Sequence, residues 1–526
     1  MTKCTWRLGV LAVCCGLAAA PPDDGSRWWS HVKFLADDKL EGRNTGSPGY
    51  RKAAEYVAAE FERAGLQPAG TSGYYQPVRF RSRRILEEQS SLALVRDGKA
   101  EPLVLGEDAV FSMRIEPAES IEAPIVFVGY GLTVPELKHD DLAGTDLRGK
   151  VALFIGGGPS SIPGPLRAHY QSAGERWKAL QAAGAIGAIT IQNPRSMDIP
   201  WARSSLARFM PAMTLAAPGQ NDTQGQKLAV TANPARADKF LAGSGHTAQE
   251  LLALATAEKP LPAFAVAASI RARVRFESAE VESPNVAAIL PGTDPKLKDE
   301  YIVLSAHLDH IGVGRPINGD AIYNGAMDNA AGTASVLELA RELGPKKNLR
   351  RSLLFLAVTG EEKGLLGSRY FATHPTVKPA SIVANLNLDM FLPLFPLKIL
   401  TAYGLEESDL GEQLRAVAAP LGVRIQSDFQ PERNLFIRSD QYNFIRRGVP
   451  ALAFKVGFEK DSAEAAIAKK WLTERYHAPS DDLAQPVDLG AAAAFNRVIL
   501  LLTEAVANRA ERPQWNAASF FRRYAE

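Results

Sequence analysis

The chain has 526 residues, of which 46% are hydrophobic and 22% are charged, so it can bury a large core in two domains or in one domain with a big insertion. Its formal net charge of +2 gives no indication of a nucleic-acid partner. Gly and Pro occur without a period, and the absence of repeats or low-complexity tracts indicates an ordinary folded protein.

The first twenty residues have the pattern of a signal peptide. Two basic residues precede an apolar run over 8–20, which is too short to span a bilayer. We therefore expect 1–20 to be a signal peptide and the protein to be exported, to the periplasm or out of the cell, with a lipid anchor on Cys14 as the less favoured alternative. No later stretch predicts a membrane span. The three cysteines, Cys4, Cys14 and Cys15, all lie in this segment, so cysteine metal ligands are not expected.

The pattern of apolar residues, Gly and Pro divides the rest of the chain into a discontinuous domain and an insert. Apolar residues at helical spacing predict an amphipathic helix over 49–64, within a discontinuous domain formed by 21–102 and 268–526. The segment 103–267 contains short apolar runs interrupted by Gly and Pro, which indicates a compact, mainly β insert domain.

From about residue 269 onward, strands alternate with helices, which predicts an α/β fold. A largely buried sheet with helices on both faces, in three layers α/β/α, is typical of this pattern. The expected elements are strands at 285–290, 301–306, 352–358 and 381–388, and helices at 329–343, after Gly364 and at about 489–509.

Five short motifs in this part of the chain carry histidines and carboxylates. Three of them follow predicted buried strands, and the carboxyl ends of such strands are where open α/β sheets place their sites. Together they supply two imidazoles, one carboxylate able to bridge two cations, two terminal carboxylates and one spare carboxylate, which suits a pair of Zn²⁺ ions. The motifs are SAHLDHIG (305–312), GAMDNAAG (325–332), TGEEKGLLGS (359–368), NLNLDMF (385–391) and ERYHAPSDD (474–482).

Each motif alone is weak evidence for a site. A single histidine after a strand is more often a hydrogen-bonded structural residue, a Glu-Glu pair is usually a solvated turn, and Asp328 could merely cap a helix. Asp309 strengthens the case for His307, because alternate residues of an extended segment point the same way and a carboxylate can orient an imidazole. The joint occurrence of the motifs in this order makes the metal-site hypothesis strong.

On these motifs the chain resembles the co-catalytic zinc exopeptidases, family twenty-eight of the metallopeptidases, which includes secreted bacterial aminopeptidases, glutamate carboxypeptidase and the transferrin receptor. LADDKLEGRNTGSPG (35–49) is similar to the opening of the family, and FIRSDQYNFIRRGVPAL (436–452) is similar to a later stretch. The insert 103–267 resembles the protease-associated domain that members carry. The resemblance implies a two-zinc hydrolase with a peptide substrate.

The resemblance also implies a role for each candidate residue. His307 and Asp389 would bind one zinc, Glu362 and His477 the other, and Asp328 both, with Glu361 as general base, Asp309 as the orienting partner of His307 and Tyr476 as an aid to oxyanion stabilisation. Two details accompany these roles. The peptide bond from Asp328 to Asn329 is expected to be cis, and Gln441 stands where members often have His.

The resemblance leaves the reaction partly open. An aminopeptidase is favoured, whereas a carboxypeptidase for acidic residues would need guanidinium groups that clamp carboxylates, and the arginines near the motifs do not by themselves indicate such a clamp. A one-zinc glutaminyl cyclase and a receptor-like binding protein are further alternatives, and the complete ligand set disfavours the second. The insert could limit access to short peptides or act as a spacer. The oligomeric state and the preferred side chain are not predicted.

Overall fold

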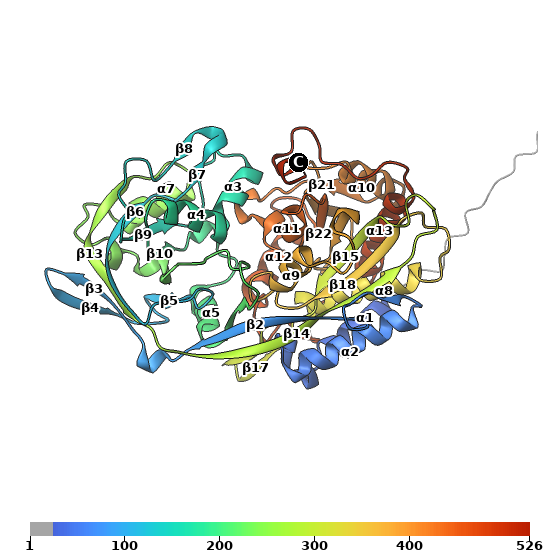
Figure 1. Cartoon of the computed structure of the whole chain (residues 1–526), viewed down its shortest axis with the longest axis horizontal. Helices are drawn as coiled ribbons and strands as arrows, with labels where there is room; N and C mark the ends of the chain where they lie inside the picture. The colour runs from blue at the N-terminus through green and yellow to red at the C-terminus, as the bar shows by residue number, and fades with distance from the viewer. Residues whose placement is uncertain (1–24, 526) are drawn as a thin grey trace, which may run out of the picture.

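The computed structural model describes residues 25–525, so the predicted signal peptide 1–20, with its cysteines, lies outside the described residues. Two lobes lie side by side along the longest axis of the molecule, and each is built on its own sheet (Figure 1). Two long antiparallel strands, β2 (Tyr75–Ile85) and β14 (Phe276–Leu290), run from one lobe to the other. The larger lobe is the predicted three-layer domain, and the smaller one contains the predicted insert.

The larger lobe contains a ten-stranded mixed sheet whose central strands are parallel and buried. These central strands are continuous runs rich in Leu, Val and Ala, as expected for strands covered on both faces. The strands predicted at 285–290, 301–306, 352–358 and 381–388 are all confirmed. In spatial order the sheet consists of β11 (Ala212–Leu215), β2, β14, β18 (Ser352–Val358), β15 (Tyr301–His307), β19 (Ile382–Asn387), β22 (Ala451–Gly457), β20 (Ile399–Tyr403) and β21 (Arg424–Gln426), with β1 (Gln67–Pro68) beside β14.

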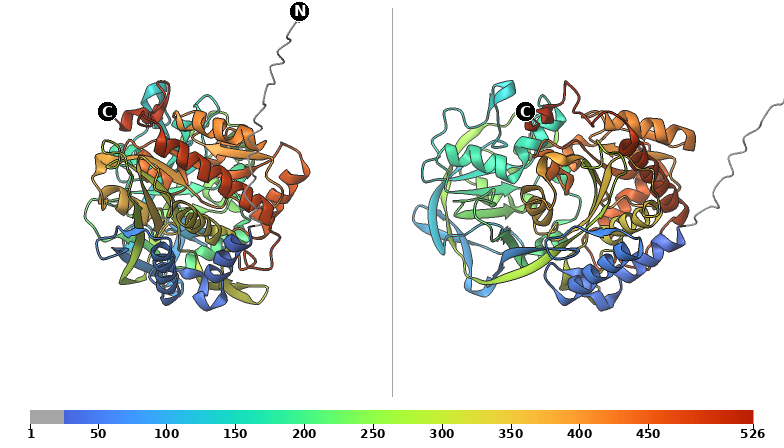
Figure 2. Two further views of the ribbon diagram at one scale, coloured as in Figure 1. Left: turned by 90° about the vertical axis from the view of Figure 1, so that its right-hand side faces the viewer. Right: turned by 45° about the vertical axis from the view of Figure 1, so that its right-hand side comes forward.

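Helices cover both faces of this sheet, as predicted (Figure 2). Alternate residues of β15 enter different cores: Ile302 and Leu304 pack with α1, α2, α8, α10 and α13, whereas Val303 packs with α9 and α11. Among the described helices, α13 is long and apolar enough to cross a membrane, but half of that stretch is buried in the lobe. The helices are α1 (Ser26–Leu35), α2 (Pro48–Arg63), α8 (Ala331–Leu343), α9 (Leu366–Thr373), α10 (Leu410–Ala418), α11 (Gln441–Ile445), α12 (Ala463–Glu474) and α13 (Leu489–Asn508).

The smaller lobe contains an eight-stranded sheet that extends beyond the predicted insert 103–267 at both ends. The chain enters this sheet at residue 91 and leaves it at residue 273. The predicted boundaries of the insert are therefore too narrow. Residues 91–102 and 268–273 already pair with strands of the smaller lobe, although their composition resembles that of the larger lobe. In spatial order the strands are β4 (Lys99–Leu103), β3 (Ser91–Arg96), β13 (Ala263–Arg273), β6 (Ser120–Val128), β9 (Val151–Ile155), β10 (Gly187–Ile191), β12 (Leu228–Ala232) and β5 (Ala109–Phe111).

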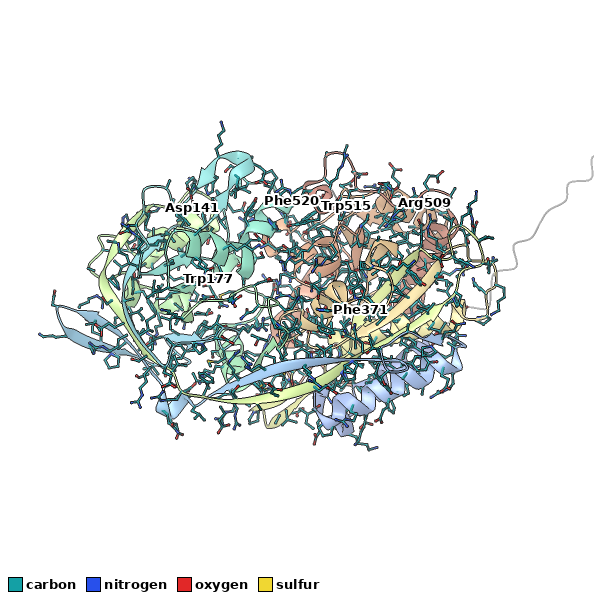
Figure 3. All side chains as sticks on the ribbon, in the orientation of Figure 1. Asp141, Trp177, Phe371, Arg509, Trp515 and Phe520 are labelled. Atoms are coloured by element: carbon teal, nitrogen blue, oxygen red, sulfur yellow. The ribbon has the colours of Figure 1, made fainter. Side chains whose placement is uncertain are left out.

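Helices accompany this second sheet more extensively than a mainly β domain suggests. The strands β6, β9, β10 and β12 are parallel neighbours, and a parallel pair needs a crossover connection, which is usually helical. Each lobe has its own core, with Trp177 in the smaller lobe and Phe371 in the larger one (Figure 3). The remaining elements are α3 (Gly164–Gln171), α4 (Ala173–Ala182), α5 (Trp201–Ser204), α6 (Asp238–Leu241), α7 (Ala248–Thr256) and the hairpins β7 (Thr133–Val134) with β8 (His139–Asp140) and β16 (Gly312–Ile317) with β17 (Asp320–Tyr323).

Ion pairs join the two lobes close to the edge of the larger sheet. Asp198 of the smaller lobe accepts hydrogen bonds from Arg433 at 2.9 Å and from Arg438 at 2.8 Å. Asp222, also of the smaller lobe, pairs with Arg369 at 2.9 Å and with Arg446 at 3.0 Å. Each carboxylate therefore binds two guanidinium groups of the opposite lobe.

We expect the contribution of Asp198 to stability to be lost in acid. Burial raises the pKa of its carboxyl, but Arg438 and Arg433 outweigh burial and hold the pKa below the usual value. A carboxyl with a depressed pKa stabilises the fold above its unfolded pKa of about 4, and this contribution disappears as the pH falls through the folded pKa. Thermal unfolding of the wild type and of Asp198→Asn should therefore differ at pH 7 and converge near pH 3. An equal difference at both pH values would contradict this.

Candidate metal centre

The predicted ligands meet at the carboxyl edge of the central strands. β15 ends at His307, Glu362 follows β18, and Asp389 follows β19. Asp328 lies in the turn before α8, and His477 lies in the loop after α12. Because β15, β18 and β19 are parallel neighbours, segments that are far apart in the sequence end at one edge of the sheet.

The five side chains form two groups that share one carboxylate. In the first group, His307 Nε2 lies 3.2 Å from Asp328 Oδ1 and 3.4 Å from Asp389 Oδ1. In the second, His477 Nε2 lies 3.2 Å from Asp328 Oδ2 and 3.3 Å from Glu362 Oε2. Zinc–ligand bonds of about 2.0–2.1 Å in a tetrahedron place neighbouring ligand atoms about 3.3 Å apart. Each group therefore fits one zinc ion, and each oxygen of Asp328 faces one group.

The electrostatics of the two groups also suit cations. Burial lowers the pKa of the His477 imidazole, but Glu362 and Asp328 outweigh burial and raise it to about 10. Asp389 Oδ1 is buried and has no hydrogen-bond donor in the described part of the chain. A buried carboxylate oxygen without a donor is costly unless a cation faces it. The donor set of imidazoles and carboxylates without thiolates is one that zinc accepts.

Glu361 and Tyr476 line the same small cavity as the ligands His307, Asp328 and Asp389. Burial raises the pKa of the Glu361 carboxyl well above its usual value, and Glu362 raises it further, although His307 opposes the shift. This brings Glu361 closer to the pKa that a general base needs near neutral pH. Burial also raises the pKa of Tyr476, so that its hydroxyl stays protonated and can donate a hydrogen bond.

Asp309 contacts His307 differently from the prediction. The backbone carbonyl of Asp309, not its carboxylate, lies 3.0 Å from His307 Nδ1, because β15 ends at His307 and the strand alternation ends with it. The carboxylate instead accepts hydrogen bonds from the backbone N–H groups of Glu361 at 3.1 Å and Glu362 at 3.4 Å. The hydroxyl of Thr45 also donates to it, at 3.0 Å. Asp309 thus holds the Glu-Glu turn in place.

Asp481 positions the shared carboxylate and was not among the predicted site residues. Its buried carboxylate accepts hydrogen bonds from the backbone N–H groups of Met327 at 2.9 Å and Asp328 at 3.0 Å. It lies four residues after His477, so it ties the loop of one ligand to the turn of another. The motif ERYHAPSDD contains this residue, but an Asp-Asp pair in a turn gives no sign of its distant partner.

Two further details of this site concern Asn329 and Gln441. The peptide bond between Asp328 and Asn329 is cis, as the resemblance implied. Gln441 Oε1 accepts a hydrogen bond from Asn387 at 2.9 Å, and Gln441 Nε2 donates to the carbonyl of Phe436 at 2.8 Å. The glutamine therefore fixes the loop that bounds the small cavity.

His310 is a second residue of the site that the prediction missed. It is fully buried, and its Nδ1 lies 2.7 Å from Glu362 Oε1, while Glu362 Oε2 faces His477. The distance from His310 Nδ1 to Asp328 Oδ2 is 3.9 Å. Among the described residues neither His310 Nδ1 nor Glu362 Oε1 has a hydrogen-bond partner, and their separation of 2.7 Å is shorter than the spacing of two ligands on one zinc. We conclude that His310 orients Glu362.

Replacing His310 by alanine is expected to weaken metal retention by about 10- to 100-fold, because residues that orient a ligand have effects of this size. Zinc content per chain, measured after dialysis against graded chelator, would check this. His374→Ala, at an exposed histidine of the same lobe, is the matched control. Equal retention in both variants would exclude an orienting role for His310.

Comparison with known sequences agrees with this site. Residues 285–503 match the model for peptidase family M28, a range that contains all five candidate ligands. Aminopeptidase Y of Saccharomyces cerevisiae is 28% identical over 213 residues, which cover 39% of this chain and 35% of that protein. A probable zinc metalloprotease of Pyrenophora teres f. teres is 38% identical over 112 residues, which cover 21% of this chain and 23% of that protein. The matches thus span well under half of either relative.

Two solved structures share the fold over both lobes. An aminopeptidase from Aneurinibacillus sp. strain AM-1 superimposes with a TM-score of 0.57 at 20% identity and covers 94% of this chain and 98% of its own. A zinc aminopeptidase from Bacillus subtilis gives a TM-score of 0.50 at 18% identity, with 93% and 97% covered. At such identities the likeness shows the architecture. Residues 285–503, which carry the five candidate ligands, are thus similar to peptidase family M28.

Proposed function

We propose that the chain is an exported aminopeptidase that holds two Zn²⁺ ions and removes the first residue of a peptide. The observation that carries this proposal is the pair of donor groups around His307 and His477, which share Asp328 at the spacing of tetrahedral zinc. The names of relatives, among them an aminopeptidase Y and a zinc aminopeptidase, support the choice of reaction. The apolar run over 8–20 supports export to the periplasm or beyond the cell.

Each residue of the site would have its own task. Two zinc ions, held by His307 with Asp389 and by His477 with Glu362, and both by Asp328, would supply an activated water and polarise the scissile carbonyl. Glu361 accepts the proton of the attacking water and passes it to the leaving amine. Tyr476 donates a hydrogen bond to the developing oxyanion, and Asp309 keeps Glu361 in place through its backbone N–H.

The small cavity beside the ligands supports cleavage at a chain end. It has a volume of about 60 Å³ and is bounded by Met390, Tyr403 and Phe454 as well as by the ligands. This volume is far below the several hundred cubic ångströms of a typical ligand pocket. A cavity of this size suits a single terminal residue of a substrate, which is what an exopeptidase binds beside its metal site.

An activity panel tests the proposal. Aminoacyl chromogenic substrates, their N-acetylated forms and carboxypeptidase substrates would be compared with and without chelator. We expect hydrolysis of the free aminoacyl substrates alone, its loss on chelation and its return with added Zn²⁺. Preferred cleavage of carboxypeptidase substrates would contradict the proposal, and so would release of ammonia from peptides that begin with glutamine, the reaction of a cyclase.

A further inference from the structure

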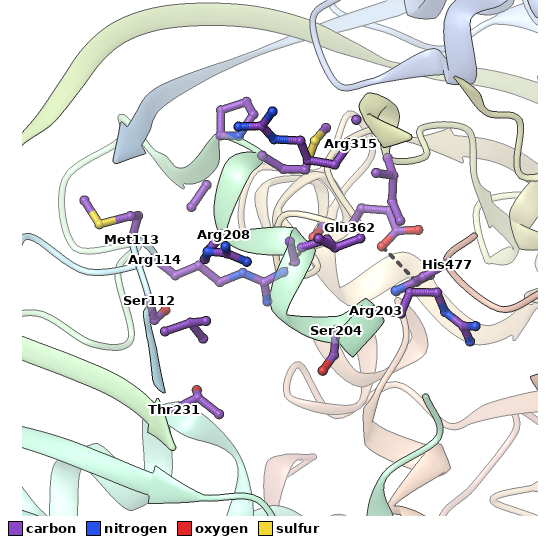
Figure 4. Close-up of a pocket in the computed structure, with 18 of the residues that line it drawn as sticks. Ser112, Met113, Arg114, Arg203, Ser204, Arg208, Thr231, Arg315, Glu362 and His477 are labelled. Atoms are coloured by element: carbon purple, nitrogen blue, oxygen red, sulfur yellow. Dashed lines mark hydrogen bonds and ion pairs between the residues drawn. The ribbon is translucent and has the colours of Figure 1, made fainter. Parts of the chain in front are cut away.

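A second, larger cavity lies between the two lobes, at the Glu362 and His477 side of the metal centre (Figure 4). It has a volume of about 410 Å³. The smaller lobe contributes the segment that follows β5 and the region around α5, and the larger lobe contributes the hairpin of β16 and β17. Both cavities are lined by His477, so if the terminal residue of a substrate fills the small cavity, the larger one is placed to receive residues after the scissile bond.

The wall of this cavity carries a surplus of positive charge. Its single carboxylate, Glu362, is already a candidate metal ligand. Neutral side chains such as Phe111, Met113 and Tyr323 make up much of the remaining wall. The cations are Arg114, Arg203, Arg208, Arg315 and Lys363.

Two of these cations already have partners within the protein. Arg208 pairs with Glu87 at 2.7 Å. Arg203 donates hydrogen bonds to the backbone carbonyls of Leu472 at 3.0 Å and Thr473 at 2.6 Å, next to the loop that carries His477. These contacts fix the cavity wall.

The other three cations have no carboxylate partner within 4.0 Å among the residues that the structure describes. Arg114 donates one hydrogen bond, to the backbone carbonyl of Glu362 at 2.6 Å. The guanidinium of Arg315 lies 4.3 Å from the centre of the Phe209 ring. Lys363 is 5% exposed, and its ammonium group makes no hydrogen bond or ion pair with any residue that the structure describes. Cations that lack a directly paired carboxylate favour an anionic ligand.

We propose that this cavity binds a carboxylate of the substrate on the leaving-group side of the scissile bond. The inference rests on the proposed function and names its substrate class: short peptides with a free C-terminus or peptides with an acidic side chain after the first residue. Arg114 and Arg315 suit this role because a guanidinium can bind a carboxylate with two parallel hydrogen bonds. Lys363 adds a point charge close to Glu362.

Matched substrates separate the two sources of the carboxylate. Leu-Gly-Gly and its C-terminal amide differ in the terminal carboxylate, and Leu-Glu-amide and Leu-Gln-amide differ in the side-chain carboxylate. We expect kcat/KM to be about tenfold higher or more for the acid member of at least one pair, as a charge-assisted contact would give. A preference in the first pair identifies the C-terminus, and a preference in the second identifies the side chain.

The variant Arg315→Gln is expected to bring this ratio toward one. Its hydrolysis of the amide member shows that the variant is folded. Arg236→Gln, at an exposed arginine of the smaller lobe outside the cavity, should keep the wild-type ratio. The inference is overturned if the wild type has equal kcat/KM within both pairs, or if the ratio is unchanged in Arg315→Gln. In either case, hydrolysis of the peptides still supports the proposed function. Absence of hydrolysis of all four peptides by the zinc-loaded wild type overturns the proposed function instead.

Discussion

Replacing Glu361 by glutamine is expected to lower kcat by about 10²- to 10⁴-fold, the usual contribution of a general acid–base group. Glutamine has nearly the same shape but cannot accept the proton of the attacking water. Glu361 takes no part in the two donor groups, whose short contacts involve His307, His477 and their carboxylate partners. The zinc content of the variant should therefore stay close to that of the wild type. Steady-state kinetics on an aminoacyl substrate and elemental analysis of the same sample would check both parts.

The matched control for this experiment is Glu280→Gln, at an exposed glutamate of β14. It should retain wild-type kinetics. If the Glu361→Gln enzyme kept its activity, Glu361 could not be the general base. If zinc were lost together with activity, Glu361 would have to be a structural part of the metal site instead of a proton carrier.

The second large effect is expected for Asp328→Asn, in which one carboxylate oxygen becomes an amide nitrogen. In the wild type, Oδ1 faces His307 and Oδ2 faces His477, so one residue serves both donor groups. The neutral amide offers one oxygen and cannot bridge two cations. We expect bound zinc to fall from two ions per chain to one or none. Activity should fall on the order of a thousandfold, since a metal contributes several kcal/mol to the transition state.

The fold should survive this change, which makes the metal measurement interpretable. Asp481 holds the turn through the backbone N–H groups of Met327 and Asp328, and these contacts do not need the Asp328 side chain. Circular dichroism should therefore be unchanged. Asp299→Asn, at an exposed aspartate before β15, is the control for a carboxylate-to-amide change. Two zinc ions per chain in purified Asp328→Asn would show that Asp328 does not bridge the metals.

The core strands of the larger lobe and the place of three candidate metal ligands follow from the primary structure. β15, β18 and β19 are continuous apolar runs, and a strand buried on both faces needs such a run whatever its neighbours are. His307, Glu362 and Asp389 lie at or just beyond the ends of these runs, where parallel strands deliver side chains to one edge. The apolar runs and the parallel order of the strands therefore predict that these three side chains lie at one edge of the sheet, without knowledge of any long-range contact.

The contacts that support the candidate ligands and the cavity between the lobes are decided only by the tertiary structure. The carboxylate of Asp309 contacts the backbone of the Glu-Glu turn and not His307, because β15 ends at His307 and the strand alternation ends with it. His310 and Asp481 act through partners that are 52 and 153 residues away along the chain, and no periodicity records such pairs. The cationic cavity exists only because the lobes are docked, since each lobe supplies part of its wall. Periodicity reports which side chains are buried, whereas distances between remote segments depend on how the lobes pack.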